Sequence, residues 1–215
     1  MRRLAALAAC LALAGGCGGS DDEADQPRQV GESAGLEVYE VSSQGFSIGV
    51  PPGWRVISVD EALPEADREE LARDNPDLAP LLEAIVSGDQ PIKLFAFDPE
   101  VEDRFATNVN VLAVDLPSDV GLEDFVAANE ADIEGFGGRV DPITSEAADL
   151  PSGPARRLTY SVRVTTEGRE RTVATLQYLL VGERKGYVVT FSTLPSLTDR
   201  YEPTFDRVVR SLRVD

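Results

Sequence analysis

The sequence predicts an α+β domain built around a mostly antiparallel sheet, preceded by an export signal and a tether. Three observations predict this class. Apolar and polar residues alternate along residues 157–164, as in a strand with one buried face. Residues 201–212 instead carry apolar side chains at helical spacing. The chain from Leu36 to Asp215, about 180 residues without a second linker, suits one domain.

The N-terminus has the features of an export signal. Arg2 and Arg3 precede an unbroken apolar run from Leu4 to Ala14, about eleven residues long. A membrane-spanning helix needs about 20 apolar residues, so this run is too short for a permanent span. The sequence therefore predicts a signal peptide over residues 1–16.

The apolar run ends in Leu13-Ala14-Gly15-Gly16-Cys17, which resembles the lipobox of bacterial lipoproteins. The resemblance implies cleavage before Cys17 and attachment of lipid, including palmitate, to that cysteine. Two alternatives stay open. Leu7-Ala8-Ala9-Cys10 also fits the lipobox pattern, although its apolar run is much shorter, and the segment could be an ordinary secretory signal.

The composition excludes several kinds of site. The chain has no histidine, and the predicted cleavage leaves Cys17, blocked by lipid, as its one cysteine. Zinc and copper sites of the usual ligand types are therefore excluded, as are Cys-His and Ser-His nucleophiles, and we expect no cofactor. Of 20 basic residues cleavage removes two, leaving 18 against 38 acidic ones and a net charge of −20. This charge disfavours nucleic acid and anionic lipid headgroups as partners.

The mature chain is expected to begin with a tether and a hairpin. Residues 17–35 are polar, acidic and rich in Gly and Ser, which predicts a disordered tether. Residues 36–41 and 46–50 have strand patterns separated by a turn at residues 42–45. Pro51-Pro52-Gly53 must end the second strand, because proline cannot donate to a strand ladder.

The middle of the chain alternates between helical and strand patterns. Residues 59–86 predict two short helices separated at Pro76. Residues 92–97 and 108–114 predict strands, with an acidic loop from Asp98 to Arg104 between them. A helix follows, whose buried face is marked by Leu122, Phe125, Val126 and Ile133.

The last third predicts a meander of three strands and a closing helix. In the first strand Leu158, Tyr160, Val162 and Val164 share a face, and in the second Ala174, Leu176, Tyr178 and Leu180 share one. Residues 187–191 form the third strand. The final helix carries an apolar stripe of Tyr201, Phe205, Val208, Val209 and Leu212, with arginines near its end.

The chain resembles the PsbP/Mog1-like domain in one segment and in the order of its predicted elements. The segment is Gly45-Phe46-Ser47-Ile48-Gly49-Val50-Pro51-Pro52-Gly53-Trp54. Helices, a meander and a helix ending Ser211-Leu212-Arg213 follow it. The similarity is to the lipoproteins of high-GC Gram-positive, actinobacterial type that carry this domain. It implies an α/β/α sandwich over residues 36–215, with helices on both sides of an antiparallel sheet. It also implies a role in binding or assembly without chemistry. The two helices expected at 59–86 look like an insertion on this plan.

Aromatic residues are the candidates for lining a ligand pocket. Trp54 follows the end of a predicted strand, where its indole ring could stack on a ligand and still donate a hydrogen bond. The alternative is that Trp54 closes one end of the core. Three further aromatic residues of predicted strands are candidates for the same pocket: Phe95, Tyr160 and Tyr178.

Two charged clusters have a functional and a structural interpretation. One cluster is a run of four carboxylates that could suit calcium: Asp98, Glu100, Glu102 and Asp103. The run lacks the spacing of a calcium-binding loop. We therefore favour a solvated loop and predict no metal site. Five arginines of the meander could bind an anionic envelope component or neutralise acidic neighbours, and we favour neutralisation: Arg156, Arg157, Arg163, Arg169 and Arg171.

These observations predict a lipid-anchored, non-catalytic binding or assembly module on the extracytoplasmic face of the cell membrane. The expected partner is an envelope protein or an apolar small molecule, bound by one helical face or in a pocket. The alternative is a hydrolase that cuts an envelope glycan with two carboxylates. No spacing in the sequence selects such a pair, and motifs for nucleophilic serine or phosphate binding are absent.

Overall fold

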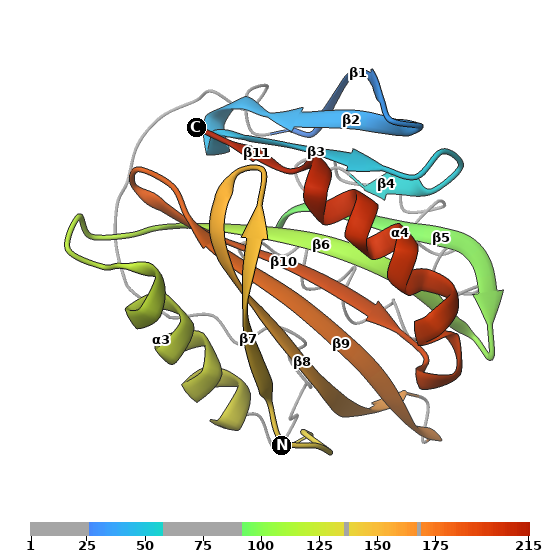
Figure 1. Ribbon diagram of the computed structural model, residues 1–215. Helices are drawn as coiled ribbons and strands as arrows, with labels where there is room; N and C mark the ends of the chain where they lie inside the picture. Colours follow the sequence, from blue (N-terminus) through green and yellow to red (C-terminus); the bar gives the residue numbers. More distant parts are fainter. Residues whose placement is uncertain (1–25, 58–91, 136–137, 167–168) are drawn as a thin grey trace.

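The computed structural model describes residues 26–57, 92–135, 138–166 and 169–215, which form two antiparallel sheets and two α-helices (Figure 1). The smaller sheet has the order β1-β2-β3-β11, from β1 (Arg28–Ser33), β2 (Leu36–Val41), β3 (Phe46–Val50) and β11 (Arg213–Val214). The larger sheet has the order β4-β5-β6-β10-β9-β8-β7, from β4 (Arg55–Ile57), β5 (Ile92–Glu102), β6 (Phe105–Asp115), β7 (Thr144–Leu150), β8 (Gly153–Thr166), β9 (Arg169–Val181) and β10 (Lys185–Thr193). The helices are α3 (Leu122–Gly135) and α4 (Thr198–Ser211), and short 3-10 turns lie at Ser42–Gln44 and Pro195–Leu197. None of the described helices is both long and apolar enough to cross a membrane.

The two helices lie on opposite faces of the larger sheet, as the predicted sandwich requires. Thr190 and Phe191 are consecutive on β10, so their side chains point to opposite faces. Thr190 accepts a hydrogen bond from Gln177, which in turn accepts one from Asn129 of α3. Phe191 stacks on Phe205 of α4 at a centroid distance of 4.6 Å. We call these the α3 face and the α4 face, and the smaller sheet lies on the α4 side (Figure 1).

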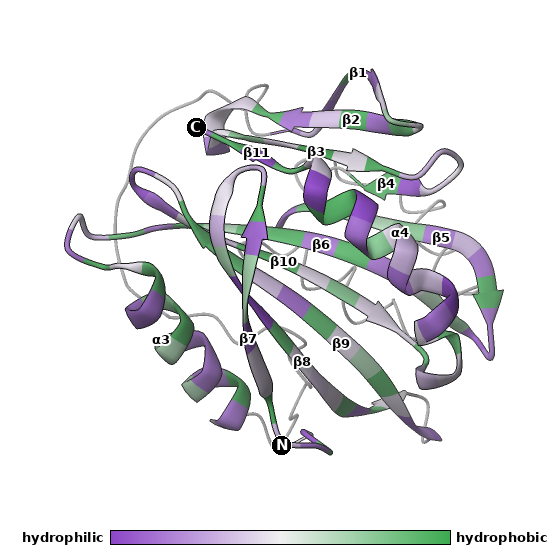
Figure 2. Ribbon diagram, in the orientation of Figure 1, coloured by the Kyte–Doolittle hydropathy of each residue, from purple (hydrophilic) through white to green (hydrophobic). Residues whose placement is uncertain are grey.

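The apolar stripe of α4 packs against the core, as its spacing predicts. Tyr201, Phe205, Val208 and Val209 are all buried. Figure 2 shows hydrophilic residues along the rest of this helix. At its C-terminal end the Ser211 hydroxyl accepts a hydrogen bond of 2.7 Å from the backbone N–H of Gly49 on β3. A Cβ on Gly49 would come within 2.8 Å of Leu36, so glycine is needed for this close approach.

The hairpin of β2 and β3, the helix α3 and the meander of β8, β9 and β10 confirm the elements predicted for those segments. Strand β3 covers residues 46–50, the predicted range. On β9 the residues 174, 176, 178 and 180 do share a face, the α4 face. The residues between them are more completely buried, because α3 covers the other face of this strand.

The structure corrects the sequence prediction at three places. The last part of the expected disordered tether forms β1, which pairs with β2 although all six of its residues are exposed. The expected acidic loop is instead a continuation of β5 and β6, which turn at Asp103 and Arg104 in left-handed conformations. A further edge strand, β7, precedes the meander. The two helices predicted for residues 59–86 lie outside the described residues.

Candidate binding site on the α3 face of the sheet

Two rows of polar side chains cross the three central strands β6, β10 and β9 on the α3 face. Cross-strand partners in an antiparallel sheet point to the same face, so the register fixes both rows. One row consists of Asn110, Thr190 and Gln177, and the other of Asn108, Ser192 and Thr175. All six residues are buried, and Figure 2 shows hydrophilic positions interspersed with hydrophobic ones along these strands. We call them the polar rows.

Some side chains of the polar rows are connected by hydrogen bonds. Asn129 of α3 donates from Nδ2 to Gln177 Oε1 at 3.0 Å, and Gln177 donates from Nε2 to Thr190 Oγ1 at 3.1 Å. Asn108 donates from Nδ2 to the carbonyl of Ala106 on its own strand at 3.0 Å. The chain of hydrogen bonds from α3 therefore ends at Thr190, in the middle of the sheet.

Three atoms of the polar rows have no hydrogen-bond partner within the described structure: Asn110 Oδ1, Thr175 Oγ1 and Ser192 Oγ. Their residues are 3%, 3% and 1% exposed, so solvent does not reach them. More than nine in ten buried polar groups in proteins are paired, and an unpaired one costs about 1–3 kcal/mol. Three such unpaired atoms lie near one another on one face of the sheet. Together they lower the stability of the folded protein.

Two further buried atoms outside the polar rows lack a partner within the described structure. They are Oδ2 of Asp132 on α3 and Nε of Arg156 on β8. Arg156 also donates from Nη2 to Glu123 of α3 at 2.5 Å. This ion pair joins α3 to strand β8.

Aromatic residues flank the polar rows at both ends. Phe95 of β5 is the cross-strand partner of Asn110, and Tyr160 of β8 is the partner of Thr175. Burial raises the pKa of the Tyr160 hydroxyl well above its ordinary value, so this group stays protonated and can donate a hydrogen bond. Two of the four predicted pocket residues therefore lie on the α3 face, with three strands between them.

The other two predicted pocket residues lie on the α4 face. Trp54 contacts Tyr201 edge to face, with ring centroids 6.4 Å apart, and Tyr178 contacts Phe191 in the same manner at 6.3 Å. Both rings are buried against α4 and the aromatic residues beneath it. Trp54 is therefore buried beside Tyr201, and the four aromatic residues are divided between the two faces of the larger sheet.

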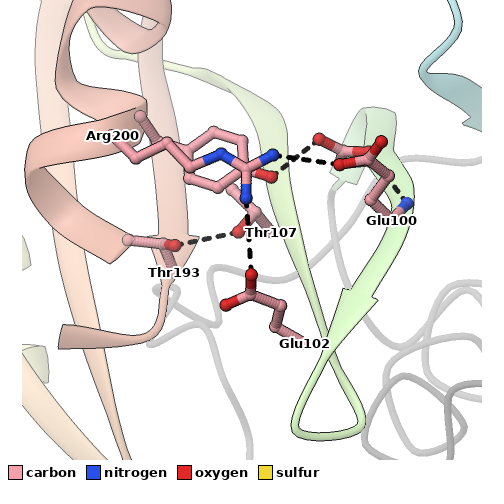
Figure 3. Close-up of polar contacts among 7 residues, drawn as sticks. Glu100, Glu102, Thr107, Thr193 and Arg200 are labelled. Carbon is pink, nitrogen blue, oxygen red and sulfur yellow. Dashed lines mark hydrogen bonds and ion pairs between the residues drawn. The ribbon is translucent and has the colours of Figure 1, made fainter. Parts of the chain in front are cut away.

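The acidic run holds the end of the β5–β6 hairpin against α4 (Figure 3). Asp98 accepts a hydrogen bond of 2.7 Å from the Tyr201 hydroxyl. Burial, followed by this contact with Asp98, raises the pKa of Tyr201 to about 12. Beside them the hydroxyls of Thr107 and Thr193, both on the α4 face, share a hydrogen bond of 2.8 Å.

The other carboxylates of this run contact arginines. Arg200 of α4 pairs with Glu100 at 2.9 Å and with Glu102 at 3.4 Å (Figure 3), and Arg171 lies 3.7 Å from Asp103. No three acidic side chains of the described chain converge as a metal site would require. The arrangement is that of charge neutralisation on a surface hairpin.

Four of the five meander arginines, all except Arg169, have an acidic partner among the described ion pairs. Arg157 contacts Glu146 at 3.3 Å and Glu202 at 3.6 Å, and Arg163 contacts Glu170 at 3.2 Å. Together with the pair of Arg156 and Glu123, these contacts favour neutralisation of neighbouring carboxylates over recognition of an external anion.

The polar rows were not identified from the sequence, although one signal for them exists. Asn108 and Asn110 alternate with Val109 and Val111 in a strand whose other residues, apart from Thr107 and the terminal Asp115, are apolar. Asparagine is rare in strands and costly to bury, so two of them in a central strand indicate a special environment. In the sequence the alternation is equally compatible with a face exposed to water.

No protein-family model matches the sequence, and no curated protein sequence matches it significantly. Similar solved structures include cyanobacterial PsbP (CyanoP) from Synechocystis sp. PCC 6803, at 19% identity and a TM-score of 0.53 over 94% of this chain and 98% of that one. The Ran-binding protein Mog1p of Saccharomyces cerevisiae matches at 11% identity and a TM-score of 0.51 over 85% and 96% of the two chains. LpqN, involved in cell envelope biogenesis of Mycobacterium tuberculosis, matches at 15% identity and a TM-score of 0.48 over 79% and 82%.

The first two likenesses show that this chain has the PsbP/Mog1-like fold. They confirm the α+β class and the sandwich inferred from the segment around Phe46 and from the order of elements. At these identities the likeness concerns the fold alone.

Proposed function

We propose that this chain is a lipid-anchored, non-catalytic module that binds a small molecule on the α3 face of its larger sheet, outside the cytoplasmic membrane. The observation that carries the binding proposal is the set of three buried, unpartnered atoms in the polar rows. Each costs the free protein stability, and a bound molecule that pairs with them recovers that cost.

The surface offers less support for a protein partner. Among the described residues only Val30 and Val140 are large hydrophobic side chains with substantial exposure. The apolar sides of α3 and α4 both pack against the sheet, so neither is left as a docking face. A stable interface usually has an apolar centre, and the interior polar rows are therefore the better candidate site.

A binding role also fits the carboxylates better than hydrolysis does. A glycosidase needs two carboxyl groups facing each other across a cleft. Asp98, Glu100 and Glu102 instead contact Tyr201 and Arg200, which hold the hairpin on α4. This use of the acidic side chains supports the non-catalytic proposal.

The binding proposal is tested by a matched pair of isosteric substitutions. Thr175→Val removes an unpartnered buried hydroxyl, so it should raise the free energy of unfolding by about 1 kcal/mol. Thr193→Val removes a buried hydroxyl that is bonded to Thr107, so it should lower the free energy of unfolding by about 1–2 kcal/mol. Urea melts of both variants provide the comparison. If Thr175→Val destabilises the protein as Thr193→Val does, the Thr175 hydroxyl is satisfied in the free protein and the proposal loses its basis.

The anchor is tested by the two cysteines, each replaced separately. Cys17→Ser should release the protein from the membrane fraction, because it removes the proposed site of lipid attachment. Cys10→Ser, within the proposed signal peptide, should leave it in the membrane. Retention of the Cys17→Ser protein, or release of the Cys10→Ser protein, would contradict the lipobox assignment.

A further inference from the structure

We infer that the molecule bound at the polar rows is a small neutral polyol, whose hydroxyl groups pair with Asn110, Thr175 and Ser192. This inference rests on the proposed binding function and specifies the ligand class for the same site. It follows from the charge, the donor and acceptor balance and the spacing of the groups on the α3 face.

The side chains of the polar rows are uncharged. All six are amides or hydroxyls. A buried ion without a counter-charge costs far more than a buried neutral polar group. The nearby cation, Arg156, already contacts Glu123, and the polar rows have no charged group of their own to compensate a ligand's charge. A neutral ligand is therefore favoured.

The unpartnered atoms of the polar rows require a donor from the ligand. Asn110 Oδ1 can only accept hydrogen bonds, whereas the hydroxyls of Thr175 and Ser192 can either donate or accept. A ligand here must supply at least one donor without a positive charge. Hydroxyl groups, which both donate and accept, meet this requirement.

The three unpartnered atoms lie on three different strands of the sheet. Neighbouring strands lie about 4.8 Å apart, and successive residues on one face of a strand lie about 7 Å apart. Thr175 and Ser192 are cross-strand partners, and Asn110 lies in the adjacent row. One polar group cannot reach all three atoms, whereas a ring or short chain with several hydroxyls can. The flanking rings of Phe95 and Tyr160 offer apolar surface to the carbon skeleton.

Helix α3 lies beside the polar rows. Within the described residues, two polar side-chain contacts join it to the sheet, from Asn129 to Gln177 and from Glu123 to Arg156.

The test is a calorimetric titration of the mature chain carrying Cys17→Ser. The neutral probes are myo-inositol and glucose, and the charged probes of matched skeleton are glucosamine and glucuronate. We expect at least one neutral probe to bind at least tenfold more tightly than both charged ones. We expect Thr175→Val and Ser192→Ala to weaken that binding at least tenfold, whereas the control Thr193→Val, on the opposite face, leaves it unchanged.

Each contrary result has a distinct meaning. If a charged probe binds as tightly and Thr175→Val abolishes its binding, the neutral class is wrong and the binding site stands. If a neutral probe binds but Thr175→Val has no effect, the polyol is bound elsewhere and the inference is overturned. If neither neutral probe binds, the inference is also overturned. The proposed binding function is then judged by the unfolding comparison of Thr175→Val with Thr193→Val, which requires no ligand.

Discussion

Truncation of Phe205 tests whether α4 is part of the core. Phe205 is 3% exposed, and its ring stacks between Phe191, at 4.6 Å, and Tyr201, at 5.9 Å. Removing a buried phenylalanine side chain costs about 3–5 kcal/mol, and each aromatic pair contributes about 0.5–1.5 kcal/mol beyond burial. Because Phe205→Ala loses two ring pairs as well as burial, we expect a loss of about 4–5 kcal/mol.

The assay is urea unfolding of the mature chain carrying Cys17→Ser. With a urea dependence of about 2 kcal/mol per M, the midpoint of Phe205→Ala should fall by about 2 M. Arg207→Ala on the exposed side of the same helix is the control, and it should cost under about 0.5 kcal/mol. If Phe205→Ala unfolds at the wild-type midpoint, α4 does not stabilise the sheet and its apolar stripe must be a surface for a partner.

Three further contacts can be tested by stability measurements. Because the pKa of Tyr201 is raised in the folded protein, its hydroxyl loses the proton at a lower pH in the unfolded chain than in the folded one. The free energy of unfolding should therefore decrease as the pH rises from about 10 to about 12. Tyr201→Phe should show a smaller loss over this range in urea melts, and an equal loss would contradict the raised pKa. Gly186→Ala should destabilise the protein because its Cβ would lie 2.6 Å from the Phe125 ring, whereas Gly121→Ala meets no atom within 4 Å and should be nearly neutral in thermal melts. Arg200→Ala should cost under about 1 kcal/mol, and less at high salt, because its ion pairs with Glu100 and Glu102 are exposed. A large, salt-independent loss in urea melts would show that these pairs do more than neutralise charge.

The sequence predicts those elements whose side chains are divided between a buried and an exposed face. In strand β3 the apolar residues Phe46, Ile48 and Val50 occupy every second position, and in α4 the apolar residues recur at helical spacing. Both patterns can be recognised in the sequence. The class and the order of elements follow from such segments. The PsbP/Mog1-like fold can therefore be inferred from the amino-acid sequence alone.

The elements that the sequence did not predict are held by backbone hydrogen bonds at sheet edges. All six side chains of β1 are exposed, and β7, with the sequence TSEAADL, is almost entirely exposed. Strand β1 is stabilised by pairing with β2, and strand β7 by pairing with β8. Both bury almost no side chain, so neither sequence shows a periodic pattern of apolar residues. The acidic end of the β5–β6 hairpin escaped prediction because contacts with Tyr201 and Arg200, distant in sequence, hold it in place.

The candidate site could not be predicted from local patterns for a related reason. A polar residue in a strand usually points to water, and Thr175 and Gln177 alternate with apolar residues as they would on an exposed face. Contacts between residues distant in sequence, such as Phe125 with Gly186 and Asn129 with Gln177, place α3 over part of this face. Of the residues chosen from the sequence, Phe95 and Tyr160 lie beside the polar rows, and Trp54 and Tyr178 serve the core of the other face.

The most direct test of ligand binding at the polar rows is NMR of the side-chain amides of the mature chain carrying Cys17→Ser, during titration with myo-inositol and with glucose. The Nδ2 protons of Asn110 and the Nε2 protons of Gln177 report on the two ends of one row. We expect at least one probe to shift both signals saturably, with the same dissociation constant. Saturation of shifts elsewhere while Asn110 and Gln177 stay unchanged, or no shift with either probe, would contradict it.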